Sequence, residues 1–557
     1  MTGNQLLFLL PHLVLIGGGV LTLIGARLLR RTTAWGAVAL LAIVVAAVCV
    51  HQSPATDSPF AGAVNVAFLF AGGVLVLGAW NPMGAAHERL DTHGLILCGV
   101  ACAMLVAWVD DAVLLLVLLE LCGLAAVGMS PLVYRLQPAD AHELNRNTSI
   151  GPAEAGTPAA ATGVTRQALI LQAVSAALLL LAVMLICFDQ QTTSLSELRE
   201  QFTGAVQSAA ETGLRSSPTR LGRAGFVLLF AAVAVKAFLV PFHFGAPEVL
   251  TRSSTTACSY ALTVSRGAAL IVLFRVGIVT FAGFESPGLV VSAVLSGGTM
   301  LIGTALAVGR ERLRETLTYL FIGHGGTVLF GLCIAWGRGA AATELPLPPP
   351  FLTRGETAAG LTLLSVSLSV LGAFSLLNSL RTDDRPVEYV EELTGLLRER
   401  PLAAAALAVL LLNLVGVPPL PGFWSRLLTW TAALAVTRQP LDGFPSPHPA
   451  FLILSAAMGV QILIAAGVLF RIVAATAFEP PMGRSRATGG LPALLAGGVC
   501  TLLVVVIGFL PSRTIAMLNS VIPQSHVIPA GQSTSAGSSR SVMRSNSHAF
   551  PAATSRP

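Results

Sequence analysis

The chain has 557 residues, of which 54% are hydrophobic and only 11% are charged. This balance excludes a soluble globular protein and indicates a polytopic membrane protein. The formal net charge of +6 comes from arginines spread through short connections, a distribution that does not indicate nucleic-acid binding. Eight cysteines lie in apolar runs without any C-x-x-C pair, so we expect them to bind neither a metal nor a redox cofactor.

Windows of about 20 apolar residues predict about fourteen membrane-spanning helices. We expect the first to be a retained helix, because no basic segment precedes it. Polar or Pro-rich connections cover residues 137–166 and 338–354, and we expect no soluble domain. The predicted spans cover residues 5–25, 34–51, 60–80, 93–109, 111–133, 167–188, 224–244, 256–280, 288–308, 316–336, 358–378, 401–434, 449–475 and 489–511.

Arginines orient these predicted spans. Eighteen lie in the connections that follow odd-numbered spans, whereas seven lie in the alternate connections. Short cytoplasmic connections carry the excess of basic residues, so the first set is expected to be cytoplasmic. Both termini are then predicted on the outer face, although four arginines in the C-terminal tail oppose the bias.

Prolines interrupt two of the predicted spans. In the seventh, Pro241 follows within a turn and a half of Lys236, the only lysine of the chain. In the twelfth, Pro418 and Pro419 interrupt the run at 401–434. A helix broken at membrane depth frees backbone groups and is tolerated only beside protein or a water-filled cavity. The breaks lie five spans apart, which predicts two inverted repeats with a site at their interface, unless both are unrelated proline kinks.

Ionisable residues inside predicted spans mark candidate functional sites, because charge is costly in a bilayer. Glu120 lies in the middle of the fifth span and needs a partner, which Lys236 could supply. A lysine in changing electrostatic surroundings can take up and release a proton, whereas an arginine stays charged. The alternative is that Lys236 lies near a span end and its ammonium reaches the interface. Asp110 and Asp111, at a span junction, are expected at the interface.

Four further residues are candidates. Arg266 lies in the eighth predicted span, and Arg426 follows the second break. His324 lies in the tenth span, where a neutral imidazole could relay a proton between its two nitrogens. It could equally be a structural histidine that is hydrogen-bonded to a neighbouring carbonyl. His243 lies at the first break, and we expect it mainly to satisfy freed backbone groups.

These segments resemble the antiporter-like membrane subunits of respiratory complex I, the proton-pumping NADH:quinone oxidoreductase, and subunit N most closely. VKAFLVPFHFGAPEV at 235–249 is similar to K-x-x-x-x-PFH-x-W-x-P-D-V, with Gly245 in place of tryptophan and Glu248 in place of aspartate. IGHGGTV at 322–328 resembles I-A-H-A-G-Y. GVPPLPGFWSR at 416–426 resembles G-I-P-P-x-x-G-F-x-x-K, and its double proline favours subunit N over subunit M.

The expected fold is therefore an all-α polytopic membrane protein with two inverted five-helix repeats, each containing a broken helix. The first three helices occupy residues 1–92. The two antiporter-like halves occupy residues 93–281 and 282–478. The last span lies in residues 479–512, and a disordered Ser-rich tail is expected in residues 513–557.

The resemblance implies a proton-translocating membrane-arm subunit of complex I in a bacterial inner membrane, with both termini on the periplasmic face. Glu120 and Lys236 would form the coupled pair of the first half, and His324 would lie on a central hydrophilic axis. The chain would bind no cofactor itself. NADH, FMN, iron–sulfur clusters and quinone would belong to partner subunits, and its own contacts would be those subunits and the lipid bilayer.

Two departures keep other functions open. Arg266 and Arg426 stand where the resembled family usually has lysines, and a guanidinium should not pass its own proton on. A general preference for arginine explains them equally well, because this chain has 32 arginines and one lysine. The alternatives are a subunit of a multi-subunit cation/proton antiporter and a scaffold paralogue whose proton path is blocked.

Overall fold

The structure is a computed structural model, and its described part is almost entirely helical. The described residues are 3–29, 32–52, 58–80, 92–129, 158–201, 220–243, 246–276, 285–337, 354–382, 385–437, 449–480, 486–488 and 490–522. The α-helices are α1 (Gly3–Leu29), α2 (Thr32–Gln52), α3 (Pro59–Ala79), α4 (Thr92–Val106), α5 (Ala112–Met129), α7 (Pro158–Gln190), α9 (Arg220–Lys236), α10 (Ala246–Arg252), α11 (Thr255–Tyr260), α12 (Arg266–Phe274), α13 (Glu285–Gly298), α14 (Leu313–Gly337), α15 (Gly355–Ser379), α16 (Leu396–Glu399), α17 (Pro401–Val415), α18 (Pro421–Thr437), α19 (Pro449–Phe478), α20 (Leu491–Phe509) and α21 (Pro511–Val521). The π-helical turns are η1 (Ala261–Ser265) and η3 (Thr299–Gly303), the 3₁₀ turn is η5 (Val390–Leu393), and the strands are β1 (Leu380–Thr382), β2 (Arg385–Pro386) and β3 (Arg486–Thr488).

Within the described residues, ten helices are long and apolar enough to cross a membrane. Three shorter apolar helices cover Thr92–Val106, Leu289–Gly303 and Pro401–Val415. This composition confirms the predicted class of a helical polytopic membrane protein. The count of fourteen spans and the inverted repeats stay predictions.

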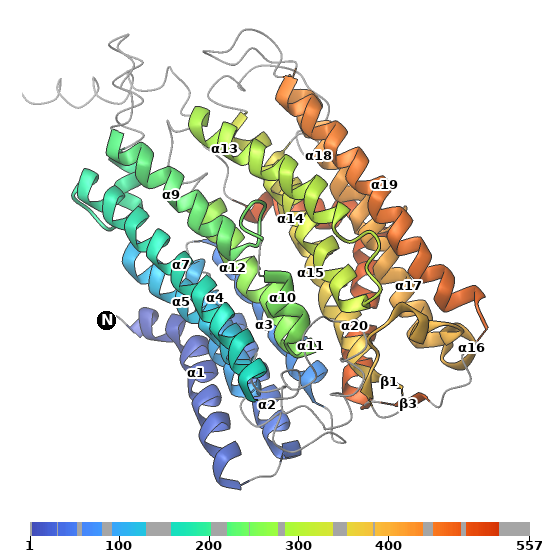
Figure 1. Cartoon of the computed structure of the whole chain (residues 1–557). Coiled ribbons are helices and arrows are strands. Elements are labelled where there is room, and N and C mark those ends of the chain that lie inside the picture. The colour runs from blue at the N-terminus through green and yellow to red at the C-terminus, as the bar shows by residue number, and fades with distance from the viewer. Residues whose placement is uncertain are drawn as a thin grey trace, which may run out of the picture.

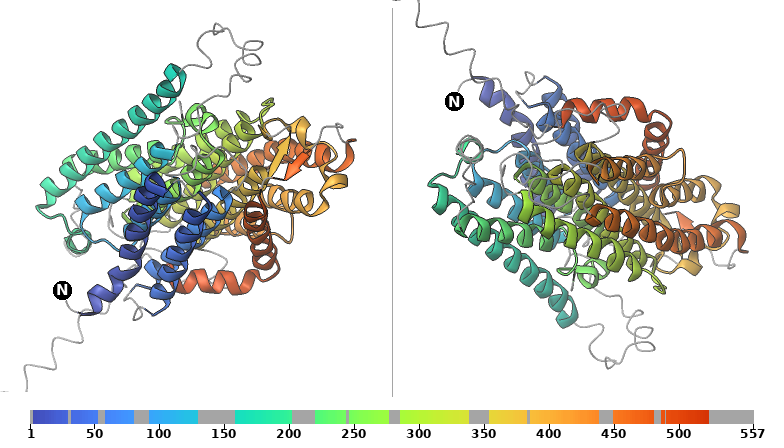
Figure 2. Two further views of the ribbon diagram at one scale, coloured as in Figure 1. Left: turned by 90° about the horizontal axis from the view of Figure 1, so that it is seen from below. Right: turned by 90° about the horizontal axis from the view of Figure 1, so that it is seen from above.

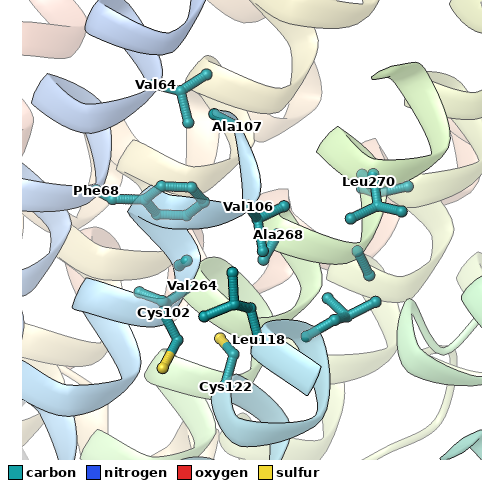
Figure 3. Packing of buried hydrophobic residues seen from close by; sticks show 14 of the residues in the cluster. Val64, Phe68, Cys102, Val106, Ala107, Leu118, Cys122, Val264, Ala268 and Leu270 are labelled. Atoms are coloured by element: carbon teal, nitrogen blue, oxygen red, sulfur yellow. The ribbon is translucent and has the colours of Figure 1, made fainter. Parts of the chain in front are cut away.

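The long helices lie side by side, with the N-terminal helices at one end of the bundle and α17–α19 at the other (Figures 1 and 2). Burial separates central from peripheral helices. In the windows 255–274 and 313–336, 94% of residues are buried, compared with 28% in the window of α7. The exposed apolar side chains of the peripheral helices suit contact with acyl chains, whereas α11–α12 and α14 form the interior. Figure 3 shows this interior where Phe68, Leu118, Cys122 and Val264 pack together.

In the first broken helix, the regular α-helix α9 ends at Lys236. The break was predicted at Pro241, and the helix ends five residues earlier for a steric reason. A proline ring clashes with the carbonyl four residues earlier, here that of Ala237, and also restricts the preceding residue, Val240. The Val240 amide instead donates to the hydroxyl of Thr299 in η3, at 3.0 Å. The broken segment is thereby hydrogen-bonded to η3, which lies at the start of the predicted second half.

The second broken helix consists of α17 and α18. Gly416 ends α17 with φ of +87°, a left-handed conformation that glycine adopts without strain. Pro421 opens α18, where a proline suits the first helical position. Asn413 joins the two parts, because its side-chain oxygen accepts the Gly422 amide at 2.7 Å.

Two features differ from the sequence predictions. The three short strands form an antiparallel sheet in the order β2-β1-β3, which the all-α expectation did not include. The expected disordered tail begins too early at 513, because α21 is a helix. Its Ile515 is buried, and Thr357 donates to the Asn519 side chain, so packing against α15 orders a segment too polar to be predicted as a span. Residues 523–557 lie outside the described part.

Candidate functional site

Glu120 and Lys236 form an ion pair inside the bundle. Glu120 lies in α5 and Lys236 at the end of α9, and the Lys236 Nζ lies 3.1 Å from the Glu120 Oε1. The side chains are 4% (Lys236) and 14% (Glu120) exposed, so the pair is largely shielded from surrounding solvent or lipid. The last carbonyls of α9 also favour a positive charge at this position. The structure therefore brings together the two residues that the sequence singled out.

Gln172 completes this pair, although it was not among the residues predicted from the sequence. This residue of α7 donates through its Nε2 to the Glu120 Oε2 and, at 3.1 Å, to the Glu120 backbone carbonyl. The two carboxylate oxygens thus face different partners, one charged and one neutral. Gly123 leaves space for the amide, since a Cβ there would lie 2.5 Å from the Gln172 Nε2. The signal available was an amide side chain within an otherwise apolar predicted span.

A cavity of about 70 Å³ lies beside Lys236. Its polar lining comes from Gln172 and Ser175 of α7, Lys236 itself, and Ser265 of η1. The volume suffices for several water molecules, each of which needs at least about 10–15 Å³ measured in this way. The other residues that line the cavity are apolar, and the cavity extends from Lys236 of the ion pair to Ser265, the residue that precedes Arg266.

Arg266 is buried at the start of α12, with 3% of its surface exposed. Its guanidinium donates from NH1 to the Phe321 carbonyl at 2.5 Å and from NH2 to the Ile322 carbonyl at 3.0 Å, both in α14. Within the described residues, Arg266 forms no ion pair with a carboxylate. This cation is therefore held by backbone dipoles, and it joins α12 to the helix that carries His324.

His324 is buried in α14 and contacts a second amide that was not predicted from the sequence. Its Nδ1 lies 3.3 Å from the Nε2 of Gln461 in α19. The Gln461 Oε1 in turn accepts a hydrogen bond of 2.9 Å from the Thr327 hydroxyl. His324 is therefore oriented by a side-chain network rather than by a single backbone carbonyl.

Arg426 lies one turn into α18, at the second break. Its NH1 donates to the Gly422 carbonyl at 3.0 Å, and its NH2 donates to the carbonyl of Leu414 in α17. The guanidinium thus joins the two parts of the broken helix. Arg426 and His324 line a common cavity of about 10 Å³, with Asn413 among the other polar residues, and this volume suits about one water molecule.

His243 lies at the first break and is also buried, with 4% of its surface exposed. It is hydrogen-bonded to the backbone of Pro241. This contact fits the expected role of satisfying a freed backbone group. The two motif departures at this break, Gly245 and the side chain of Glu248, lie outside the described part.

Together these residues form a series of buried polar sites across the bundle. The series runs from the Glu120–Lys236 pair and its cavity, which reaches Ser265, to the adjacent Arg266, and on to His324 and Arg426. Such an arrangement can hold water and separated charges inside an apolar helix bundle. Among these residues, Lys236, Glu120 and His324 have side chains that can take up and release a proton, whereas the guanidiniums of Arg266 and Arg426 stay charged.

Comparisons with known proteins agree with the motifs. A family model described as NADH:quinone oxidoreductase/Mrp antiporter, TM, matches residues 158–347 and 351–441. The chain is 28% identical over 523 residues to NADH-quinone oxidoreductase subunit N of Geobacillus kaustophilus, which covers 88% of this chain and 90% of the relative. It is 33% identical over 233 residues to subunit N of Azorhizobium caulinodans. That match covers 42% of this chain, which spans about half, 46%, of the relative's length.

Solved structures share the fold. A chain of respiratory complex I from Thermus thermophilus with bound aureothin superposes with a TM-score of 0.65 and 21% identity, covering 91% of this chain and 99% of the other. A chain of the Mrp complex from a Dietzia species gives a TM-score of 0.68 and 19% identity, covering 95% and 99%. The two matched segments of the family model make up half of the sequence, and the chain therefore belongs to the NADH:quinone oxidoreductase/Mrp antiporter family of membrane subunits.

Proposed function

We propose that this chain is a proton-translocating membrane-arm subunit of a complex I-type NADH:quinone oxidoreductase. The buried ion pair of Glu120 and Lys236, at a helix break and beside a cavity, is the observation that carries the proposal. The names of its subunit N relatives support the assignment to complex I. A lysine in such a place can alternate between a paired ammonium and a neutral amine.

In this proposal the Glu120 carboxylate stabilises the charged form of Lys236. Quinone reduction in partner subunits would change the charge distribution along the membrane arm. A weaker pairing would favour release of the lysine proton into the adjacent cavity, because an isolated charge is poorly solvated inside the bundle. Restored pairing would favour uptake of the next proton.

The second half of the chain would carry the proton onward through water and His324. Arg266 and Arg426 would stay charged and would order water and set the local field without passing on their own protons. The Gln461 amide would hold the imidazole of His324 in place. His243 would remain a structural residue of the break.

The remaining assignments follow from complex I membership. The chain would contact other membrane and peripheral subunits and the lipid bilayer. It would lie in the bacterial inner membrane with both termini on the periplasmic side. It would hold no cofactor of its own, and NADH, FMN, iron–sulfur clusters and quinone would be bound by its partners.

The direct test is Lys236→Ala in the assembled complex reconstituted into vesicles. We expect NADH-dependent quinone reduction to persist in part while the number of protons moved per electron falls. Assembly is checked by co-purification of the partner subunits. Unchanged proton movement per electron would remove Lys236 from the path.

A second candidate is a subunit of a multi-subunit cation/proton antiporter, which the similarity to the Mrp complex chain over 95% of this chain supports. Gentle purification of the tagged chain separates the two candidates. Recovery with flavin, iron–sulfur clusters and NADH:quinone activity would support complex I. Recovery with small membrane subunits and no redox cofactor would support the antiporter.

A third candidate is a scaffold paralogue with a blocked path, and the bonding of both guanidiniums to backbone carbonyls favours it. The combined reversion Arg266→Lys with Arg426→Lys tests this possibility. Increased pumping in the reverted protein would indicate that the arginines block the path. Unchanged or reduced pumping would favour a path that operates with fixed cations.

A further inference from the structure

The guanidinium of Arg266 occupies the space where a side chain of residue 325 would otherwise lie. Gly325 follows His324 in α14. A Cβ built on Gly325 would lie 1.5 Å from the NH2 of Arg266, 2.6 Å from its Cζ and 3.2 Å from its Nε. These distances involve the whole guanidinium and not only its tip. No L-amino acid with a side chain can therefore replace Gly325 while Arg266 keeps its position.

Two constraints prevent Arg266 from moving aside. Its side chain is almost fully enclosed, with 3% of the residue exposed. Its NH1 and NH2 are bound to the Phe321 and Ile322 carbonyls, which lie about one turn before Gly325 in the same helix. Displacing the guanidinium would leave a buried cation without these acceptors, and an unsatisfied buried charge is strongly destabilising.

The geometry suits a guanidinium in particular. Its planar group presents several N–H donors in a fixed fork and can contact two adjacent carbonyls at once. An ammonium is a compact point charge on a flexible stem and would leave part of this volume empty. A glycine at 325 and an arginine at 266 are thus complementary in shape.

We infer that Gly325 determines which side chain can occupy position 266. Because residue 325 has no side chain, the guanidinium of Arg266 fits there and is held against α14, beside His324. The two residues act as one unit, here called the Arg266–Gly325 clamp. It joins α12, in the first predicted half of the chain, to α14, in the second. In one respect this inference rests on the proposed function: the clamp keeps a permanent positive charge beside the histidine that is expected to relay protons.

Four proteins test the clamp: the wild type, Gly325→Ala, Arg266→Lys and the combination of both substitutions. The measurement is thermal unfolding of the purified full chain in lipid nanodiscs. We expect Gly325→Ala to lower the melting temperature most, and Arg266→Lys to recover most of that loss in the combined variant, because the shorter cation vacates the space that the new methyl group needs. A combined variant that melts no higher than Gly325→Ala would overturn the inference.

Gly326 supplies the matched control. A Cβ there would lie 2.6 Å from the backbone nitrogen of Met300 and 2.7 Å from the carbonyl oxygen of Ser296, so Gly326→Ala clashes with backbone rather than with Arg266. We expect Arg266→Lys to give no recovery in a Gly326→Ala background. Equal recovery in both backgrounds would show that the effect is not specific to the clamp and would overturn the inference.

If Gly325→Ala does not accumulate, the yield of folded chain becomes the measurement. The clamp predicts that the combined variant accumulates and the single variant does not. Absence of both, with normal yield of Arg266→Lys alone, would contradict it. Neither the yield nor the melting temperature depends on proton pumping, so these outcomes are distinguishable from a failure of the proposed function.

A separate measurement tests the role of the fixed positive charge of Arg266. In the reconstituted complex, the combined variant replaces the fixed cation by a titratable amine while keeping the fold. We expect the number of protons moved per electron to vary with pH differently in the combined variant and in the wild type. An identical pH profile would limit the clamp to a structural role and overturn the assignment of a fixed charge at this point.

Discussion

The Lys236 ammonium contacts one oxygen of the Glu120 carboxylate at 3.1 Å while the Gln172 amide contacts the other oxygen. Three helices, α5, α7 and α9, thus meet at one carboxylate in the interior of the bundle. The pair lies where α9 stops, so its surroundings include a helix end and a cavity rather than uninterrupted apolar packing.

Breaking this pair should destabilise the protein strongly. In Glu120→Gln the Lys236 ammonium loses its counter-ion, and loss of one partner of a buried pair costs about 3–5 kcal/mol. The combined variant Glu120→Gln with Lys236→Met should be more stable than Glu120→Gln alone, because the uncompensated charge is gone. Thermal unfolding in nanodiscs measures the stability of both variants. A single variant as stable as the wild type would contradict the burial of the pair.

The Gln172 amide should contribute measurably to the same site. Gln172→Leu removes the hydrogen bond to the carboxylate, and the expected loss is about 1–3 kcal/mol of folding free energy. The matched control is Gln190→Leu at the end of the same helix, where the amide bonds to the adjacent Asp189. We expect the control to melt close to the wild type. Equal losses in both variants would mean that Gln172 stabilises α7 generally and not the ion pair.

Asn413 should be essential to the second break. Its amide donates to the Ser365 and Ser369 hydroxyls at 2.9 and 2.8 Å, and its oxygen accepts the Gly422 amide. Asn413→Leu removes the acceptor of the Gly422 amide and the donor to the two serine hydroxyls. The expected loss is about 2–4 kcal/mol of folding free energy, because more than one buried polar group loses its partner. Asn378→Leu, which removes one bond to the Gly78 carbonyl, is the control and should lose less.

Asp111 should give the protein an acid-sensitive contact outside the spans. The Thr193 hydroxyl and the Leu114 amide hold the pKa of Asp111 below its ordinary value. A carboxyl whose pKa is lowered in the folded state contributes stability above its unfolded pKa, about 3.9, and loses it as the pH falls through the folded value. Asp111→Asn should therefore show a smaller drop in melting temperature than the wild type when the pH is lowered from about 6 to about 3. An unchanged drop would contradict this linkage.

The charged residues and the breaks were predictable because they violate a strong pattern. A glutamate or lysine in a run of apolar residues is rare in a span, and proline cannot continue a helix. These two rules identified Glu120, Lys236 and both broken helices from the sequence. The motif resemblance then identified the family, which the comparisons confirm.

The neutral parts of the site were not predictable in the same way. Gln172, Asn413 and Gln461 are ordinary polar residues whose importance depends on which way each helix is rotated and which helix lies opposite. Gly325 is one of 54 glycines, and only the position of Arg266 distinguishes it. The short strands and α21 were missed because their stability comes from tertiary contacts, not from local hydrophobic pattern.

The substitution Lys236→Arg tests the central claim most directly. An arginine can keep the ion pair with Glu120, so the complex should assemble and reduce quinone with NADH. Because a guanidinium does not release its proton, the number of protons moved per electron should fall toward the value for Lys236→Ala. A Lys236→Arg complex that pumps as many protons per electron as the wild type would show that proton exchange at this residue is not required.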